Sequence, residues 1–213
     1  MKKFTKPISI ILSVLMLLGM LAVMPVGAAD NSGTTGGCAW EFDAETETLT
    51  VSGEGAMDDY EWNWDFTTYY NTPWRNYRTG IKNVVIGDGV TYIGQDSFAR
   101  CENCSTVTIG NSVKTIGREA FDECDLTEVV IPDSVETIAD SAFYWNKNLS
   151  DLTLGESVTS IGKYAFQDCA LTEVTIPATV TEIGDHALGY RYVTGEYMPV
   201  EDRKSTRLNS SHS

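Results

Sequence analysis

The dominant feature of the chain is a pattern of apolar residues that recurs five times between Val84 and Leu188. Each copy reads V-x-I followed by V-x-x-I-G-x-x-A-F, and successive copies lie 23, 22, 23 and 22 residues apart. The same steps separate the members of a strand position (Val84, Val107, Val129, Leu152, Val174), an isoleucine position (Ile93, Ile116, Ile138, Ile161, Ile183) and an aromatic position (Phe98, Phe121, Phe143, Phe166, Leu188). Three registers that share one period predict a repeat architecture.

Each copy predicts one coil of a winding chain. Val174 and Ile176 are two residues apart and therefore face the same side of a strand, which Pro177 ends because it has no N–H to donate. Gly184 is expected to permit a tight bend, and Ala187 to lie on a short helical turn against the neighbouring coil. About seven apolar side chains per coil, worth roughly 1.5–3 kcal/mol each when buried, only offset the entropy of ordering the coil. The coils must therefore stack, and we predict a repeat solenoid that is mainly β with short helical turns.

The segment before the repeats is expected to cover the open end of the first coil. Residues 39–43 and 48–52 alternate apolar and polar side chains, which predicts a β-hairpin, and an aromatic-rich stretch follows at 60–77. Because a solenoid needs such a cover, we predict a β-rich N-terminal cap over residues 38–80, followed by the repeats over residues 81–190.

The repeat residues resemble a known family. The pattern V-x-x-I-G-x-x-A-F-x-x-C-x-x-L-x-x-V-x-I-P, found from Ile81 to about Tyr190, is similar to the BspA-type leucine-rich repeat of bacterial surface proteins. The lead-in to such arrays is also similar to segments of the cap, at residues 49–57, 73–74 and 81–86. Ala139, Asn146 and Leu188 depart from the pattern, which has glycine, cysteine and phenylalanine there. The resemblance implies a leucine-rich-repeat stack and a role in adhesion or partner binding.

The first residues are expected to lie outside the repeat fold. A basic start, an apolar run over residues 8–24 and small residues at 26–29 are typical of a secretory signal peptide, which we assign to residues 1–29. A retained membrane anchor is the alternative, and the short apolar run disfavours it. Residues 30–37 are rich in Gly, Ser and Thr and are expected to form a flexible lead-in.

The last residues are also expected to be separate. Residues 191–201 start a degenerate repeat. Residues 202–213 resemble the translation of a common sequencing adapter, so we interpret them as an artefact, with a natural polar tail as the alternative, and expect the natural protein to continue beyond Glu201 with a different sequence. The chain carries 15 basic and 30 acidic residues; without both end segments, residues 30–201 carry 9 and 29, a net charge of −20. Such a surface repels nucleic acid and anionic membranes, and could either attract cations and basic partners or simply be solvated.

The cysteines are interpreted as core residues. Cys101 and Cys104 form a C-x-x-C motif, which in other contexts is a redox motif or half of a zinc site. Here Cys101, Cys124 and Cys169 share one repeat position, and Cys104 occupies the position of leucines in later copies. Free cysteine suits such packing, and no second pair completes a zinc site. A disulfide between Cys101 and Cys124 stays possible, because adjacent coils lie about 5 Å apart.

Catalytic chemistry is not expected. The two histidines are His186 and His212, and neither belongs to a G-x-S-x-G, H-E-x-x-H or phosphate-binding motif. We therefore predict no enzyme, no catalytic or metal-binding residue and no cofactor.

Two groups of exposed residues are candidates for binding. The first flanks the buried strand position on both sides and comprises Asn83, Thr106, Glu128, Asp151 and Glu173, with Val85, Thr108, Val130, Thr153 and Thr175. The second comprises cap aromatics that could stack on a glycan, Trp62, Trp64, Tyr69 and Tyr70. The alternatives are a solvated acidic face for the first group and a cover for the first coil for the second.

The function predicted from these observations is a bacterial, secreted or cell-surface, non-catalytic binding or adhesion module for a protein or glycan partner. It excludes nucleic acid as a partner and stable membrane insertion after signal removal. One alternative is a targeting or spacer region of a larger secreted enzyme cut off near Glu201, and another is a purely structural spacer.

Overall fold

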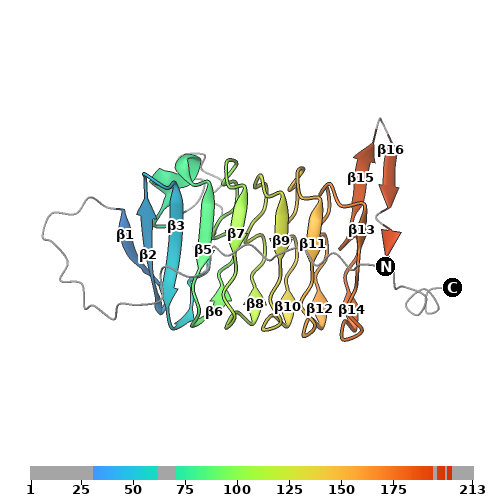
Figure 1. The fold of residues 1–213 in the computed structure, drawn as a ribbon, viewed down its shortest axis with the longest axis horizontal. Helices are drawn as coiled ribbons and strands as arrows, with labels where there is room; N and C mark the ends of the chain where they lie inside the picture. Colours follow the sequence, from blue (N-terminus) through green and yellow to red (C-terminus); the bar gives the residue numbers. More distant parts are fainter. Residues whose placement is uncertain (1–30, 62–70, 194–195, 200, 203–213) are drawn as a thin grey trace, which may run out of the picture.

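A computed structural model describes residues 31–61, 71–193, 196–199 and 201–202. Its strands lie side by side along one axis in two rows, so the chain winds as a β-solenoid (Figure 1). The predicted repeat solenoid is confirmed. The elements are β1 Ser32–Thr35, β2 Cys38–Asp43, β3 Thr48–Gly53, β4 Gly55–Ala56, the 3-10 helix η1 Arg75–Gly80, β5 Asn83–Ile86, β6 Val90–Ile93, β7 Thr106–Thr108, β8 Thr115–Ile116, β9 Glu128–Val130, β10 Thr137–Ile138, β11 Asp151–Thr153, β12 Ser160–Ile161, β13 Glu173–Val174, β14 Glu182–Ile183, β15 Tyr190–Val193, β16 Glu196–Pro199 and β17 Glu201–Asp202.

The cap continues directly into the first coil. β2 and β3 form the predicted antiparallel hairpin, and β3 then pairs in parallel with β5, with Leu49 beside Val84. Trp74 is fully buried and stacks on Phe98 with ring centroids 5.4 Å apart. The cap therefore covers the open end of the solenoid with a hairpin and a buried indole.

The polar segment 30–37, expected to be a flexible lead-in, is instead mostly part of the cap. Ser32–Thr35 forms β1, antiparallel to β2. Backbone hydrogen bonds need no apolar side chains, so a Gly/Ser/Thr-rich sequence can still complete a sheet. The buried Thr35 hydroxyl accepts hydrogen bonds from the Asp58 N–H at 3.1 Å and the Tyr60 hydroxyl at 2.6 Å, which fix β1 to the chain that follows β4.

The first row of strands is paired where the repeat step is 23 residues and interrupted where it is 22. β5 pairs with β7 and β9 with β11, whereas β7 and β9, neighbours in Figure 1, share no ladder, and neither do β11 and β13. The second row, β4, β6, β8, β10, β12 and β14, is a continuous parallel sheet with the repeated isoleucines in register.

A turn of variable length explains the interruptions. Two residues separate Cys101 from Cys104, but a single residue separates Cys124 from Leu126. Cys104 N–H donates a turn hydrogen bond to the Cys101 carbonyl at 2.8 Å, and the short turn before β9 has no counterpart among the described backbone bonds. The chain therefore enters β9 without the turn hydrogen bond that precedes β7, and the ladder between the two strands is interrupted here. The C-x-x-C spacing is thus the signature of a long turn.

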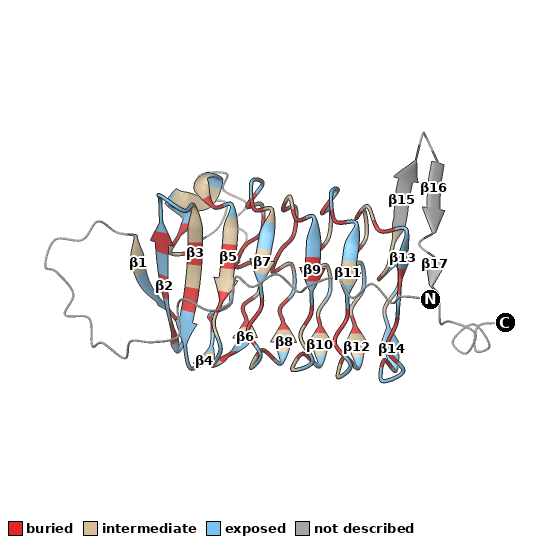
Figure 2. Ribbon diagram, viewed as in Figure 1, coloured by how far each residue is buried: buried red, intermediate tan, exposed pale blue. Residues whose placement is uncertain are grey.

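Stacked aromatic rings form the centre of the solenoid. Phe98, Phe121, Phe143 and Phe166 are fully buried, with successive ring centroids 5.0, 5.3 and 5.2 Å apart and interplanar angles of 13°, 7° and 3°. Each ring fills the space above the ring of the preceding coil, so the core is continuous along the axis although each coil is thin (Figure 2).

The short helical turns expected next to this column are hydrogen-bonded turns rather than helices. One repeat position in these turns has φ between 54° and 59° in all five coils, at Asp96, Glu119, Ser141, Tyr164 and His186. A left-handed residue in each turn prevents helical bonding. The freed N–H groups donate to the next coil instead, as from Phe121 N to the Ala142 carbonyl at 2.8 Å.

The repeated glycine is required by close packing of coils and not by a bend. The φ of Gly184 is not left-handed, and a Cβ added there would lie 2.5 Å from the backbone nitrogen of Lys163. At Gly117 an added Cβ would lie 2.5 Å from the Ile93 carbonyl oxygen. The absent side chain lets adjacent backbones approach.

Candidate functional site

The predicted binding face lies on the first row of strands. Its members from β7 onward are exposed, as the pale blue strands in Figure 2 show, while Asn83 and Val85 are half-buried. The structure brings them together in pairs rather than in a five-membered ladder. Glu128 lies in register with Asp151, and Thr106 donates a hydrogen bond of 2.7 Å to Asn83 Oδ1. These pairs follow the interruptions of the row.

A groove runs beside this face at the ends of β7, β9 and β11. It has a volume of about 890 Å³ and crosses the gap between β7 and β9. Val130, on the middle strand β9, is 52% exposed and lines the groove together with the predicted Thr108 and Thr153. The walls also include side chains that the sequence reasoning missed, because they come from the turns after the strands: Asn111, Asp133, Ser134 and Glu156.

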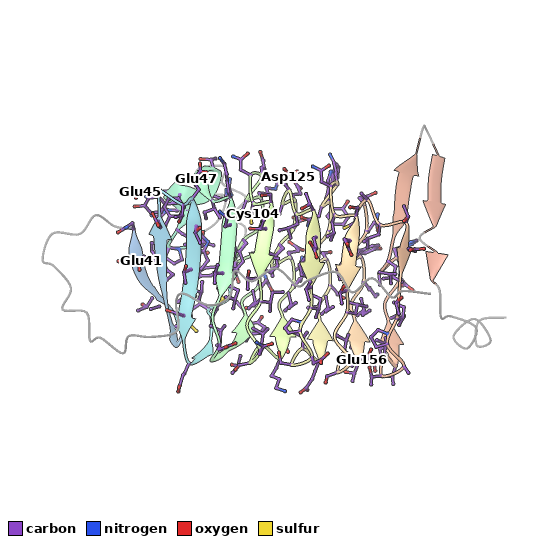
Figure 3. All side chains as sticks on the ribbon, viewed as in Figure 1. Glu41, Glu45, Glu47, Cys104, Asp125 and Glu156 are labelled. Atoms are coloured by element: carbon purple, nitrogen blue, oxygen red, sulfur yellow. The ribbon has the colours of Figure 1, made fainter. Side chains whose placement is uncertain are left out.

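Acidic side chains surround this face. Glu128 and Asp151 are register partners on β9 and β11, and Asp133 and Glu156 line the groove. Figure 3 shows Asp125 and Glu156 at opposite edges of the solenoid. Like charges about 5 Å apart repel by roughly 0.8 kcal/mol in water, so a basic partner would relieve a small existing strain.

The cysteines lie in the core, as predicted. Cys101, Cys104, Cys124 and Cys169 are all buried free thiols, as is Cys38 in the cap. Cys104, labelled in Figure 3, is fully buried. Burial raises the pKa of the Cys101 and Cys124 thiols above the ordinary value. Burial also raises the pKa of the Cys169 thiol, to about 12. A thiol that stays protonated is a poor nucleophile, so these positions do not offer redox or nucleophilic chemistry.

The repeated cysteine position also bonds between coils. Cys124 Sγ donates to the Phe98 carbonyl at 3.2 Å, and Cys169 Sγ donates to the Phe143 carbonyl at 3.3 Å. Asn146 occupies the same position in the intervening coil and donates from Nδ2 to the Phe121 carbonyl at 2.8 Å. The shared property of this position is therefore a hydrogen-bond donor, not only a fitting volume.

A second cavity, which the sequence reasoning did not find, lies among the left-handed turns. It has a volume of about 310 Å³ and is lined by Arg100, Glu119, Asp122, Glu123, Ser141, Tyr144, Tyr164 and Gln167. The small side chain of Ser141 stands in the repeat position that Glu119 and Tyr164 occupy in the coils on either side. A row of large side chains with one small member leaves a depression, and that signal is present in the sequence once the turn register is known.

Asp122 lies in the wall of this cavity and is 8% exposed. Burial is the largest cause that raises the pKa of its carboxyl to about 7; the neighbouring charges of Glu123, Glu119 and Asp96 act in the same direction, and Arg100 opposes them. Arg100 Nη2 lies 3.1 Å from Glu123 Oε1, and Arg118 is paired with Glu119.

Replacing Asp122 with asparagine is expected to stabilise the protein in a pH-dependent way. The folded pKa of about 7 is above the unfolded value of about 3.8. The contribution of the protonated Asp122 carboxyl to the unfolding free energy is therefore fully present below about pH 4 and is lost as the pH rises through 7. At about pH 8 the variant should gain roughly 2–4 kcal/mol in unfolding free energy, and close to nothing at about pH 4. Urea denaturation at both pH values measures the difference; equal gains at the two would contradict the assignment.

The remaining predicted features cannot be placed. The candidate glycan aromatics Trp62, Trp64, Tyr69 and Tyr70 and the signal segment 1–29 lie outside the described residues. Within the described part of the chain, no helix is long and apolar enough to cross a membrane, and no three acidic, histidine or cysteine side chains are grouped so that they could hold a metal ion.

Comparisons with known proteins agree with this architecture. A family model described as BspA type leucine rich repeat region matches residues 75–193 in six copies, one more than the five predicted and starting inside the predicted cap. A leucine-rich repeat protein from Eubacterium ventriosum is 30% identical with a TM-score of 0.62; the match covers 71% of this chain and 40% of that one.

Two further solved structures have lower scores. A leucine rich repeat protein of T. pallidum is 21% identical over 71% of this chain and 81% of its own, with a TM-score of 0.48. A leucine rich cell surface protein of Faecalibacterium prausnitzii is 25% identical over 78% of this chain and 57% of its own, with a TM-score of 0.41. No curated protein matches the chain.

Proposed function

Because the chain belongs to the BspA-type leucine-rich repeat family, we propose that it is a non-catalytic binding module, secreted or displayed at a bacterial cell surface. The repeat array holds the first row of strands rigidly and presents the groove beside β7, β9 and β11 to a partner. The predicted signal peptide supports an extracellular location.

The observation that carries the proposal is the groove around Val130. The groove crosses three coils, and in it the Val130 side chain, 52% exposed, lies among threonines. Together they offer apolar contact area and hydroxyl groups. The centre of a protein interface combines such contacts, with a polar rim. The rim here is acidic, with Asp133 and Glu156, so the favoured partner is a protein with a basic rim of its own, and a glycan is the alternative.

Replacing Val130 with arginine is expected to weaken partner binding about tenfold or more, because it puts a charge at the centre of the contact. The measurement is surface plasmon resonance of the secreted chain against a panel of extracellular matrix proteins and a glycan array. Ile183→Arg is the matched control, since Ile183 is also an exposed aliphatic strand residue, at 38%, but lies on the second row.

The control variant should bind like the wild type. Saturable binding that Val130→Arg leaves unchanged would exclude the groove as the contact. Absence of saturable binding to the whole panel would favour the alternatives, a spacer or the targeting region of a larger secreted enzyme.

A further inference from the structure

The cavity among the left-handed turns has a chemical character of its own. It is built from four successive coils: Arg100 from the first, Asp122 from the second, Ser141 and Tyr144 from the third, and Tyr164 and Gln167 from the fourth. It is separate from the groove at the ends of β7, β9 and β11, with which it shares no lining residue. A ligand bound here would therefore be independent of the proposed binding face.

Two hydrogen-bond acceptors in its wall lack donors. Asp122 Oδ1 and Gln167 Oε1 are both buried and have no hydrogen-bond partner among the described residues. The Gln167 amide is oriented by its other end, because Nε2 donates to Asp168 Oδ2 at 3.2 Å. Buried acceptors without donors are uncommon and destabilising, so a donor-rich ligand would find two unmet partners here.

The charge of the cavity favours a cation. Its lining contains three carboxyl groups: Glu119 is paired with Arg118 and Glu123 with Arg100, whereas Asp122 has no ion pair of its own within the described part of the chain. Asp96, which is 4% exposed, adds a fourth carboxyl close enough to raise the pKa of Asp122. In a partly desolvated site an ionised Asp122 carboxylate attracts a positive ligand more strongly than it would in water.

Aromatic rings on the same face extend the site. Tyr144 and Tyr164 line the cavity, and Tyr164 is 41% exposed. Next to Tyr144, the Trp145 ring, whose centroid lies 5.7 Å from that of Tyr144, already has Lys147 Nζ 4.4 Å from its own centroid, so a cation over an aromatic ring is formed beside the cavity.

From these contacts we propose that the turn-face cavity binds the guanidinium group of an arginine side chain on a partner protein. A guanidinium is planar, carries five N–H donors and no acceptor, and stacks on aromatic faces. These properties match unpaired acceptors, carboxylates and tyrosine rings in one place. The volume of about 310 Å³ suits an organic group of this kind rather than a bare metal ion.

The test is an NMR titration of the whole chain with Nα-acetyl-arginine amide, whose only charge is the guanidinium. Saturable binding is expected with a Kd of about 1 mM, the range set by a ligand of this size. Asp122→Asn should weaken it about tenfold, and Nα-acetyl-citrulline amide, uncharged but of the same shape, should bind about tenfold more weakly to the wild type. Because this variant is expected to be more stable than the wild type, unfolding cannot explain a loss of binding.

Glu128→Gln is the matched control, since it removes the same formal charge from the strand face. It should leave the Kd within about twofold, because screened charges across the molecule contribute little. Equal weakening by both variants, equal binding of the citrulline analogue, or binding of calcium alone with no binding of the arginine amide would each overturn the proposal. Tighter binding of Nα-acetyl-lysine amide than of the arginine amide would also overturn it.

Discussion

Replacing Phe121 with alanine is expected to lower the unfolding free energy by about 3–5 kcal/mol, the range for removing a fully buried aromatic ring. The Phe121 ring lies between Phe98 and Phe143, with centroids 5.0 and 5.3 Å away, and both contacts would be lost. Neighbouring coils cannot move together to close the space, because their spacing is fixed by the continuous second row of strands. A cavity would remain in the middle of the stack.

In a solenoid this loss has a second consequence. Each coil contacts only its neighbours, so stability is the sum of coil and interface terms along one axis. Weakening both interfaces of the second coil should separate the cap from the later coils. The expected result is a broad or two-step urea transition where the wild type has a single one.

Phe121→Leu is the matched control. Leucine occupies the same repeat position at Leu188, which packs partly buried against the core. The leucine variant should lose less than about 1.5 kcal/mol and keep one transition. A loss below about 1 kcal/mol for the alanine variant would show that the ring column is not the main source of cohesion between coils.

The parts of this fold that follow from periodicity could be predicted from the sequence. The strand, isoleucine and aromatic positions repeat with one step, and the burial of Phe98 to Phe166 and of the repeated cysteines follows from that register. The cap hairpin was predictable because alternating side chains mark its two strands. In each case local sequence and tertiary packing require the same arrangement.

The parts that depend on exact turn geometry could not be predicted. The alternation of 23 and 22 residues was visible, but its meaning lies in a turn one residue shorter before β9, which interrupts the first row. Asp96 and Glu119 have left-handed φ values, but aspartate and glutamate also occur widely in other backbone conformations. Their identity in the sequence therefore does not predict a left-handed turn. Strand β1 was missed because its pairing uses backbone groups that every sequence contains.

The candidate sites differ in the same way. Thr108, Val130 and Thr153 were predicted because strand alternation points them outward, and the groove beside them includes all three. The turn-face cavity was missed because its lining comes from positions that vary between coils: Asp122, Tyr144 and Gln167 occupy one repeat position. Where a repeat fixes the backbone and varies the side chain, periodicity predicts the frame but not the site.

The short turn before β9 also explains the one buried amide of the repeat core. In the first and third coils the residue at the leucine position donates its N–H within a turn, as Leu149 does to the Asn146 carbonyl at 3.0 Å. The shorter turn removes this bond for Leu126, and Asn146 Oδ1 accepts the Leu126 N–H at 3.3 Å instead. Asparagine is thus suited to the coil that follows a short turn, because it accepts as well as donates.

Replacing Asn146 with alanine is therefore expected to cost about 2–4 kcal/mol of unfolding free energy, because it leaves the Phe121 carbonyl and the Leu126 N–H unpaired in the core. Asn146 is fully buried, so water cannot replace the lost partners. Asn146→Cys is the informative comparison, since a thiol can donate to the Phe121 carbonyl as Cys124 and Cys169 donate in their own coils.

The cysteine variant restores the donor but not the acceptor, so it should lose about 1–2 kcal/mol, between the wild type and the alanine variant. Urea denaturation gives the order of stability, and amide hydrogen exchange at Leu126 separates the two roles. Exchange at Leu126 should accelerate in both variants, because neither offers an acceptor to its N–H. A cysteine variant as stable as the wild type, with Leu126 still protected, would mean that the donor to Phe121 is the only contribution of Asn146, and that the short turn is accommodated without it.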